Sequence, residues 1–307
     1  MNIRFNMANK EISWLNGNFI DEAEAVVPIM THSLQYGSGI FEGIRGYETS
    51  KGTEIFRLKD HVKRFFNTAK IYAMNLGYSQ EEIENAIIET VRRNNLKSCY
   101  IRPFAFYDDH GVGVGTAGKK ISVYIRALSF GKYFSADTGL KCKVSSWHRM
   151  ESAILPIEAK ASGNYLNSVL AMKEAKASGY DEAIITSRDG YVAEGPGENI
   201  FLVKDGALLT PGVDSQILLG ITRNTIIELM KESGMKVIER FIHREELYTA
   251  DEAFFVGTAA EVTPILNIDG ISVGDGKVGE ITKKVGETYF NLVQGKSKDH
   301  QDYLTIV

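Results

Sequence analysis

The hydrophobic positions along the chain change their spacing repeatedly between a period of two, typical of strands, and a period of about 3.6, typical of helices. The pattern predicts helices at residues 59–74, 81–94, 164–177, 221–231 and 278–293. It predicts strands at residues 39–47, 99–107, 121–129, 140–145, 182–186, 199–203, 207–209, 235–239, 252–256 and 262–268. Helices interrupt hairpins without regular βαβ alternation, so we expect two α+β domains of mixed, largely antiparallel sheet rather than a Rossmann sheet or a barrel.

Short local signals support this interpretation. The Asn16-Gly17 turn between apolar flanks predicts a hairpin at the start of the chain, and Asp205-Gly206 predicts another. Ser79 and Glu82 form a capping-box pattern ahead of the second helix. A polar, glycine-bearing stretch at residues 131–138 predicts a linker between a smaller N-terminal domain, residues 1–130, and a larger C-terminal domain, residues 139–307, which carries Lys160.

The composition is that of a globular protein with a large core. Of 307 residues, 44% are hydrophobic and 24% charged, and 35 basic against 39 acidic side chains leave a net charge of −4. No basic surplus indicates nucleic acid or an anionic membrane as the partner. The N-terminal residues contain no unbroken apolar stretch, so neither a signal peptide nor a membrane anchor is predicted. We therefore expect a cytoplasmic protein that binds a small molecule.

Several familiar chemistries lack their motifs. The two cysteines, Cys99 and Cys142, form no C-x-x-C pair, which indicates buried reduced thiols. The six histidines are scattered without metal-ligand spacing, so no metal site is predicted. The sequence contains no Walker A motif and no nucleophile elbow, and the glycines at positions 37–43 have the wrong spacing for a dinucleotide site.

Two charged residues stand where solubility does not require them. Lys160 lies among small residues just before an apolar helix, where a planar ring could approach a reactive amine. The alternative is a solvated surface lysine, which is the commoner case. Glu194 ends a strand among glycines and could pair with the ring nitrogen of pyridoxal phosphate, or it could be an ordinary turn carboxylate.

Three elements are suited to a phosphate group. Residues 218–223 open a helix, whose unpaired N–H groups and dipole attract anions. Residues 256–261 end a strand in small residues and carry a hydroxyl, and Arg64 adds a positive charge. Each is weak alone, because threonine is a common helix cap and a lone arginine is usually solvated.

Taken together and in this order, the segments make the chain similar to fold-type-IV pyridoxal-phosphate enzymes, and specifically to branched-chain amino acid aminotransferases. The resemblance covers nearly the whole chain. Its residues are Tyr36-Gly37-Ser38-Gly39-Ile40-Phe41-Glu42-Gly43-Ile44-Arg45, His61 with Arg64, Tyr100-Ile101-Arg102-Pro103, Gly111-Val112-Gly113-Val114, Lys160 with Ser162-Gly163-Asn164-Tyr165, Glu194-Gly195-Pro196-Gly197-Glu198-Asn199, Gly220-Ile221-Thr222-Arg223 and Gly257-Thr258-Ala259-Ala260-Glu261.

The resemblance implies a cofactor, pyridoxal 5′-phosphate, bound at the domain interface. Lys160 would form the Schiff base and move the proton at the substrate Cα, which makes it the catalytic residue. Glu194 would pair with the ring nitrogen and Tyr165 with the phenolic oxygen. The phosphate would be held by Arg64, Gly220, Ile221, Thr222 and Thr258.

The resemblance also implies a dual pocket that accepts both an aliphatic side chain and the carboxylate of glutamate. Arg102 would meet the γ-carboxylate, while Tyr100 and the Thr258-Ala259 backbone would take the α-carboxylate. The remaining substrate positions are Tyr36, Phe41, Arg45, Tyr133 and, from a neighbouring subunit, Val112 and Val114. The chain departs from the family's pattern at Ser38 and Leu219, where threonine and proline are common.

The implied activity is ping-pong transamination of L-leucine, L-isoleucine and L-valine with 2-oxoglutarate, which serves branched-chain amino acid biosynthesis and yields L-glutamate. The alternatives on this scaffold are a D-amino acid or (R)-amine transaminase and an aminodeoxychorismate lyase. A non-catalytic binding protein is the rival from another class, but a mere binder needs neither Lys160 nor Glu194. The resemblance further implies a homo-oligomer, with a dimer as the minimal unit and a hexamer as a larger form.

Overall fold

Two units make up the chain in the computed structural model, which describes residues 11–131 and 139–307. The first unit comprises Met1–Tyr133, Ala159–Gly163 and Val293–Val307, and the second comprises Phe134–Glu158 and Asn164–Leu292. Lys160 therefore belongs to the first unit and not to the second, although the sequence placed it in the larger C-terminal domain, because the chain returns to the first unit at Ala159–Gly163. The predicted linker at residues 131–138 lies almost wholly outside the described residues and stays a prediction.

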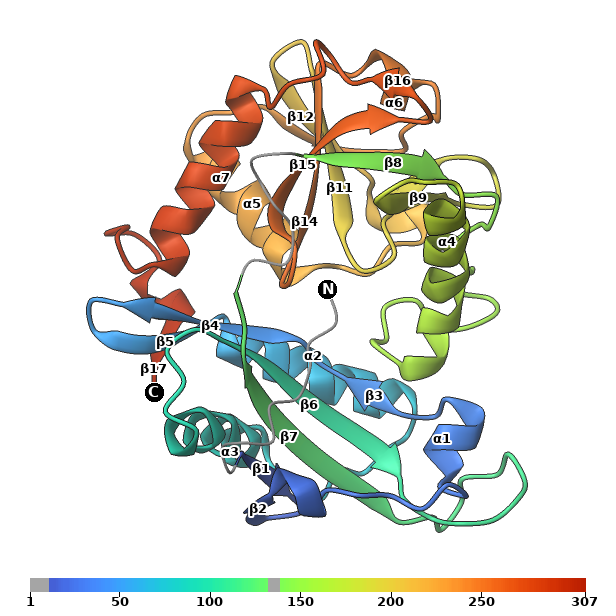
Figure 1. The fold of residues 1–307 in the computed structure, drawn as a ribbon, viewed down its shortest axis with the longest axis vertical. Helices are drawn as coiled ribbons and strands as arrows, with labels where there is room; N and C mark the ends of the chain where they lie inside the picture. Colours follow the sequence, from blue (N-terminus) through green and yellow to red (C-terminus); the bar gives the residue numbers. More distant parts are fainter. Residues whose placement is uncertain (1–10, 132–138) are drawn as a thin grey trace. The chain divides into compact units, whose positions relative to one another are not determined.

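An antiparallel sheet forms the first unit (Figure 1). Its strands run in the order β17-β5-β4-β6-β7-β1-β2, and β3 pairs with β6. Their bounds are β1 (Ile12–Leu15), β2 (Asn18–Asp21), β3 (Ile40–Phe41), β4 (Ile44–Thr49), β5 (Gly52–Phe56), β6 (Cys99–Tyr107), β7 (Ile121–Ser129) and β17 (Leu304–Ile306). The Asn16-Gly17 hairpin is confirmed, and both of its turn residues have positive φ, as the tight turn requires.

Two amphipathic helices, α2 (Leu58–Ile71) and α3 (Gln80–Arg93), pack on this sheet (Figure 1). Their buried faces carry apolar side chains at helical spacing, such as Leu58, Val62 and Phe65 on α2. The predicted capping box at the start of α3 is confirmed in both of its hydrogen bonds. The remaining helical pieces are α1 (His32–Tyr36), η1 (Glu22–Glu24) and η4 (Gln301–Tyr303).

The strand predicted at residues 39–47 is wrong as a single element. It is interrupted after β3, and β4 begins at Ile44, so Glu42 and Gly43 lie at the break. Hydrophobic alternation alone could not show this break, because both short strands pair with β6 and both are buried. The break is important because Glu42, which lies at it, is a charged residue buried in the core.

The second unit contains a mixed sheet in the order β10-β9-β8-β15-β14-β11-β12-β13, with β16 paired to β15. Because β10 also pairs with β11, six of its strands close into a small barrel, whereas the sequence led us to expect no barrel. The hydrophobic pattern is local and does not show this long-range pairing. The strand bounds are β8 (Leu140–Val144), β9 (Glu182–Thr186), β10 (Val192–Glu194), β11 (Asn199–Lys204), β12 (Ala207–Thr210), β13 (Val237–Glu239), β14 (Glu252–Gly257), β15 (Glu261–Ile268) and β16 (Ile271–Ser272).

Connection length decides the pairing direction in this unit. The Asp205-Gly206 turn joins β11 and β12 as the predicted antiparallel hairpin. Parallel pairs need longer connections, and α4 (Tyr165–Ala177) lies between β8 and β9 while α5 (Ile221–Glu232) lies between β12 and β13. The other helical elements are η2 (Ser162–Asn164), η3 (Val213–Ser215), α6 (Glu246–Thr249) and α7 (Glu280–Val293).

Both thiols are buried and reduced, as the sequence predicted. Burial raises the pKa of Cys99 to about 11, and burial together with nearby acidic groups raises the pKa of Cys142 further above its ordinary value. A thiol with a raised pKa is a poor nucleophile, so both cysteines act as core residues. Among the described residues, no helix combines the length and apolarity needed to cross a membrane.

Candidate functional site

In the first unit, Lys160 is held by its own backbone between a strand and a helix. Its N–H donates to Thr68 Oγ1 on α2 at 3.2 Å, and its carbonyl accepts from the N–H of Phe41 on β3 at 3.0 Å. The next residue, Ala161, forms a β-bridge with Ile40. The half-buried side chain places Nζ 5.3 Å from the centre of the Phe41 ring. The predicted reactive amine therefore stands on rigid elements, which restricts its motion.

The small residues around Lys160 allow two backbones to touch. The N–H of Gly163 donates to the carbonyl of Gly37 at 2.9 Å, and that of Ser162 donates to Gly39 at 2.8 Å. A Cβ on Gly37 would come within 3.1 Å of Gly163 Cα, and Gly37 also has a φ of +67°. Glycine is required at position 37 for both reasons.

A buried carboxylate lies between Lys160's two supporting elements. Glu42 is fully buried, and its Oε1 and Oε2 accept from Arg64 Nε at 2.6 Å and Arg64 Nη2 at 2.9 Å. His61 Nδ1 lies 2.8 Å from Oε2. Burial raises the pKa of the Glu42 carboxyl, but the charge and hydrogen bonds of Arg64 and the hydrogen bond of His61 outweigh it and hold the pKa far below its usual range.

This carboxylate fixes the direction of two basic side chains on α2. Burial lowers the pKa of His61, and the charges of Arg64 and Lys160 lower it further against the raising effect of Glu42. The imidazole is therefore neutral and donates its Nδ1 proton to Glu42. A role for Arg64 could be predicted from the sequence, but none was predicted for Glu42, whose only local signal is a charge between the apolar residues Phe41 and Ile44.

One face of the first sheet gathers four of the predicted substrate residues. Phe41, Arg45, Tyr100 and Arg102 share it, because Phe41 pairs with Phe104 and Arg45 pairs with Tyr100 across β6. Arg102 Nη2 donates to the Tyr100 hydroxyl at 2.9 Å.

The Arg102 guanidinium also stacks on an aromatic ring, with its carbon 4.5 Å from the centre of Phe41. Its Nε is buried and has no hydrogen-bond partner among the described residues. The arrangement offers an apolar surface and an unsatisfied cationic donor side by side. Arg45 points elsewhere, because its Nη2 donates to the carbonyl of Gly131 at 2.8 Å.

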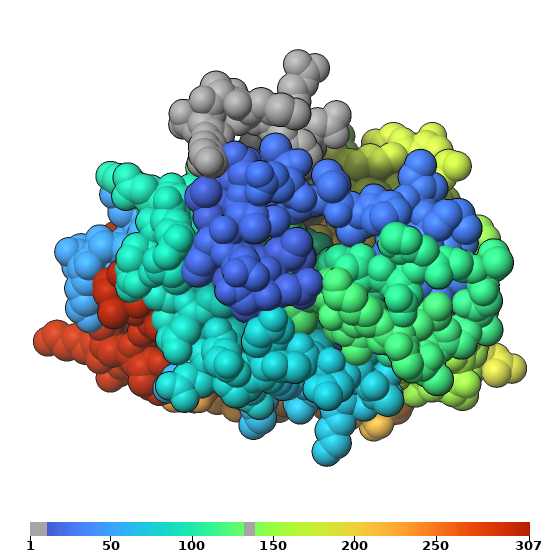
Figure 2. Space-filling view, turned by 90° about the horizontal axis from the view of Figure 1, so that it is seen from below, coloured from blue at the N-terminus to red at the C-terminus, as the bar shows by residue number. Residues whose placement is uncertain are grey.

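The loop of residues 110–119 is fastened to α1 within the same chain. The N–H of Gly113 donates to the Tyr36 hydroxyl at 2.9 Å, and Gln35 Nε2 donates to the carbonyl of Gly111 at 3.1 Å. Figure 2 shows this green loop on the surface beside the blue segment that contains α1. Val112 and Val114 are 85% and 77% exposed. Tyr36 thus supports the loop in this structure, and Tyr133 lies outside the described residues.

In the second unit, Glu194 is buried at the end of β10, next to an irregularity in the β9–β10 register. Its Oε1 lies 2.8 Å from Arg149 Nε. Its Oε2 accepts from Asn199 Nδ2 at 3.2 Å and from the backbone N–H of Leu218 at 3.0 Å. Sequence analysis missed Arg149, which lies in a loop after β8 with no pattern to mark it.

Two of the predicted anion-binding elements, residues 218–223 and 256–261, lie near one another in this unit. Helix α5 begins at Ile221, and no side chain caps it at Gly220, so its first N–H groups are left without a capping oxygen. Thr222 is buried in that first turn. Helix α5 also contacts β14, the strand that ends just before Thr258 and Ala259. Tyr165 is the first residue of α4.

A close approach explains Gly220. A Cβ at this position would lie 2.1 Å from Asn199 Oδ1, and Asn199 Nδ2 also donates to the carbonyl of Leu218 at 2.9 Å. Gly220 therefore links the start of α5 to the hydrogen bonds that hold Glu194.

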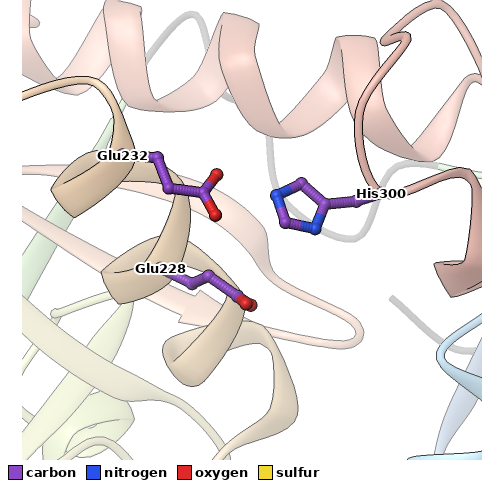
Figure 3. Close-up of side chains that lie close together, drawn as sticks. All are labelled: Glu228, Glu232 and His300. Atoms are coloured by element: carbon purple, nitrogen blue, oxygen red, sulfur yellow. The ribbon is translucent and has the colours of Figure 1, made fainter.

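Acidic side chains also lie further along α5. Glu228 and Glu232 are one helical turn apart and project from the same side of the helix (Figure 3). His300, the third residue drawn there, belongs to the first unit. Acidic pairs on helix surfaces are common without any bound ion, so we assign these residues no role.

Each unit by itself contains groups of the kinds that a phosphate-bearing carbonyl cofactor needs. The first unit supplies an amine, Lys160, and a fixed guanidinium, Arg64. The second supplies a carboxylate, Glu194, and an uncapped helix N-terminus at Ile221. These are the groups that an aldehyde, a phosphate dianion and a protonated ring nitrogen require.

Comparison with known proteins identifies the family of the chain. Residues 39–268 match the family model described as amino-transferase class IV. A branched-chain-amino-acid aminotransferase of Pseudomonas aeruginosa is 46% identical over 305 residues, which is 98% of this chain and 99% of that protein. The solved branched-chain aminotransferase from Thermoproteus uzoniensis with norvaline has a TM-score of 0.93 and 45% identity, covering 97% and 99% of the two chains. The Thermobaculum terrenum branched-chain amino acid aminotransferase, solved in its PLP-form, has a TM-score of 0.92 and 36% identity, covering 97% and 98%.

Proposed function

Because the chain belongs to the class IV aminotransferases, we propose that it transfers the amino group of L-leucine, L-isoleucine and L-valine to 2-oxoglutarate, with pyridoxal 5′-phosphate as cofactor. One observation carries the choice of substrates. The Arg102 guanidinium lies 4.5 Å from the centre of the Phe41 ring and keeps a buried Nε without a partner among the described residues. An aliphatic side chain suits the ring, and the γ-carboxylate of glutamate suits the guanidinium.

Bound pyridoxal phosphate supplies an electron sink for the charge that develops when the substrate Cα loses its proton. The residues supply binding and orientation. Arg64, held by Glu42, and the first turn of α5, with Gly220, Ile221 and Thr222, offset the phosphate charge.

Thr258 adds a further donor to the phosphate. Glu194 binds the proton on the ring nitrogen, and Tyr165 donates to the phenolic oxygen. The assignment rests on the family pattern, residue by residue, and on the burial and hydrogen bonds of Glu42 and Glu194.

Lys160 is the residue we assign to proton transfer. A lysine accepts a proton only as the free amine, and its backbone anchors to Thr68 and Phe41 limit where that amine can reach. Held in this way, Lys160 would take the proton from the substrate Cα and would hold it beside the bound cofactor. The same residue serves both directions, so one site handles the amino acid and the 2-oxo acid in turn.

In this proposal, Tyr100 and the backbone of Thr258 and Ala259 bind the substrate's α-carboxylate. The exposed Val112 and Val114 belong to a loop fastened by Tyr36, and we assign these valines to the pocket of a neighbouring subunit. Their exposure supports that assignment, because two adjacent apolar side chains on a surface loop usually meet a partner. The protein would then act as a homo-oligomer in branched-chain amino acid biosynthesis.

A half-reaction tests the proposal. The purified protein, loaded with pyridoxal phosphate, is mixed separately with L-leucine, D-alanine and (R)-1-phenylethylamine while the visible absorption of the cofactor is recorded. We expect the band to disappear with L-leucine and to return with 2-oxoglutarate, which is the ping-pong pattern. Loss of the band only with D-alanine or with the amine would assign the alternative substrates. Lys160→Ala should show no such exchange, and a variant with full turnover would refute its role.

A further inference from the structure

A cation lies directly behind the carboxylate that the proposed function assigns to the cofactor ring. Arg149 Nε is 2.8 Å from Glu194 Oε1, and the side chains are only 8% and 7% exposed. The pair is therefore shielded from solvent, where a charge interacts more strongly than at the surface.

Arg149 is placed by its backbone as well as by its charge. Its N–H donates to the carbonyl of Thr186, the last residue of β9, at 2.8 Å. The preceding residue, His148, contacts the Thr186 hydroxyl through Nδ1 at 3.1 Å. Because β9 pairs with β10, both members of the ion pair are anchored to the same two strands. Their distance is thus set by the barrel.

We propose that Arg149 is a positioning residue that keeps Glu194 ionised, so that the proton shared with the bound cofactor stays on the ring nitrogen. The inference rests on the proposed function. The proposal concerns the position of one proton. This proton is bonded to the ring nitrogen of the cofactor instead of to a carboxyl oxygen of Glu194, and nothing is oxidised or reduced. Arg149 favours the nitrogen because its charge lies against the carboxylate oxygen and stabilises the anion directly.

Another acid of this unit shows what burial does without such a cation. Glu182 is 1% exposed and has no basic group within ion-pair distance among the described residues. Burial, together with the negative charge of Glu198, raises the pKa of Glu182 to about 9. A carboxylic acid in that state is neutral at pH 7. Glu194 is buried to a similar degree, but Arg149 lies against its Oε1 and two hydrogen-bond donors meet its Oε2.

The second carboxylate oxygen of Glu194 meets neutral groups. Its Oε2 takes two neutral donors, Asn199 Nδ2 and the Leu218 N–H. The charged or titratable side chains on the neighbouring elements include Glu182 on β9, Glu198 in the turn to β11 and Arg223 in α5, and His148 precedes Arg149. Arg223 is directed to the carbonyl of Pro211 and to Glu239.

The test compares Arg149→Lys, which keeps the charge, with Arg149→Met, which removes it. The holoenzyme is loaded with pyridoxal phosphate labelled with ¹⁵N in the ring, and the nitrogen resonance is measured. We expect the wild type and Arg149→Lys to show a protonated nitrogen and Arg149→Met to move toward the neutral form. A resonance of Arg149→Met that stays at the wild-type position would overturn the inference.

A second measurement needs no cofactor. The Glu194 carboxyl carbon is titrated by ¹³C NMR in cofactor-free protein, with Glu194→Gln identifying its signal. An opposite charge at this distance lowers a carboxyl pKa by about 1–3, so removing it in Arg149→Met should raise the pKa of Glu194 by that amount. An unchanged titration would also overturn the inference. If Arg149→Met does not fold, Arg149→Gln removes the charge and keeps polar atoms.

A matched control separates charge from lost stability. Arg240→Met breaks another ion pair of the same unit, with Glu246, and puts no change next to Glu194. We expect it to leave both the ¹⁵N and ¹³C signals at their wild-type positions. In kinetics, Arg149→Met should lose kcat more than it changes KM, because ring protonation acts on the chemical step. A wild type that binds no pyridoxal phosphate would refute the proposed function, and the Glu194 titration alone would then decide the ionisation effect of Arg149.

Discussion

Replacing Glu42 by glutamine keeps the shape of the side chain and removes the charge that Arg64 and His61 surround. The carboxylate is fully buried and meets Arg64 at 2.6 and 2.9 Å. The substitution leaves the mostly buried Arg64 without its counter-charge, and breaking a buried pair in this way costs about 3–5 kcal/mol. Since solvent does not screen this pair, we expect a loss in that range in the free energy of unfolding of the first unit.

Intrinsic fluorescence measures that loss. Trp14 is buried in the first unit and Trp147 is the only other tryptophan of the chain, so a Trp147→Phe background reports on Trp14 alone. Urea unfolding curves at pH 7 then give the difference between the parent and Glu42→Gln. Glu48→Gln is the matched control, because Glu48 lies on β4 of the same sheet and forms an exposed pair with Lys97. We expect that control to unfold like its parent.

The pH dependence has a definite sign. The pKa of Glu42 is lowered in the folded state from its ordinary value of 4.5. The stabilisation is therefore fully present above about pH 4.5 and is lost as pH falls toward the folded-state pKa, since the unfolded chain binds the proton first. The gap between parent and Glu42→Gln should be constant from pH 5 to 8 and should narrow in more acidic solution. A gap below about 1 kcal/mol at pH 7, or one that widens on acidification, refutes the reasoning.

Three glycines give further predictions. Gly43→Ala would place a Cβ 2.1 Å from the Tyr100 hydroxyl oxygen, so the Tyr100 ring must shift by about 1 Å. We therefore expect kcat/KM for L-leucine to fall by about 10²-fold. Unchanged steady-state kinetics would contradict this prediction. Gly220→Ala would put its Cβ 2.1 Å from Asn199 Oδ1, so we expect a loss of about 1–3 kcal/mol in stability and faster release of pyridoxal phosphate on dialysis. Gly286→Ala, in α7 with open space around its Cβ, should instead stabilise the protein by about 0.5–1 kcal/mol in urea unfolding, and a destabilised variant would show that the site is constrained.

Local pattern was sufficient for most elements. The predicted strands at residues 99–107, 121–129 and 182–186 coincide with β6, β7 and β9, and the capping box marks the start of α3. These elements are long or carry strong end signals, so nearby residues decide them. The strand at residues 39–47 failed because a buried charge breaks it, and alternation does not register one charged residue.

Some residues of the candidate site could likewise be predicted from the sequence, and others could not. Lys160, Arg64 and Glu194 could be proposed from the chain alone, because charged residues among small and apolar neighbours stand out and because eight motifs follow one another in the order of a known family. The residues that pair with them could not be predicted from the sequence. Glu42 and Arg64 form hydrogen bonds although they are 22 positions apart in the sequence. Arg149 contacts Glu194 from a loop that lies well before Glu194 in the sequence.

The sequence by itself determined the class of the protein, because hydrophobic spacing, turn residues and ordered motifs are all properties of neighbouring positions. Tertiary structure decided which charges meet. Burial raises the pKa of Glu182, whereas a cation lies against the similarly buried Glu194, and burial depends on strands that pair over long distances along the chain. The closure of β10 on β11 is such a pairing, and so is the contact between Glu42 and α2. Long-range pairing thus decides which charged groups surround each of these residues. The sequence alone could identify the residues but not their surroundings.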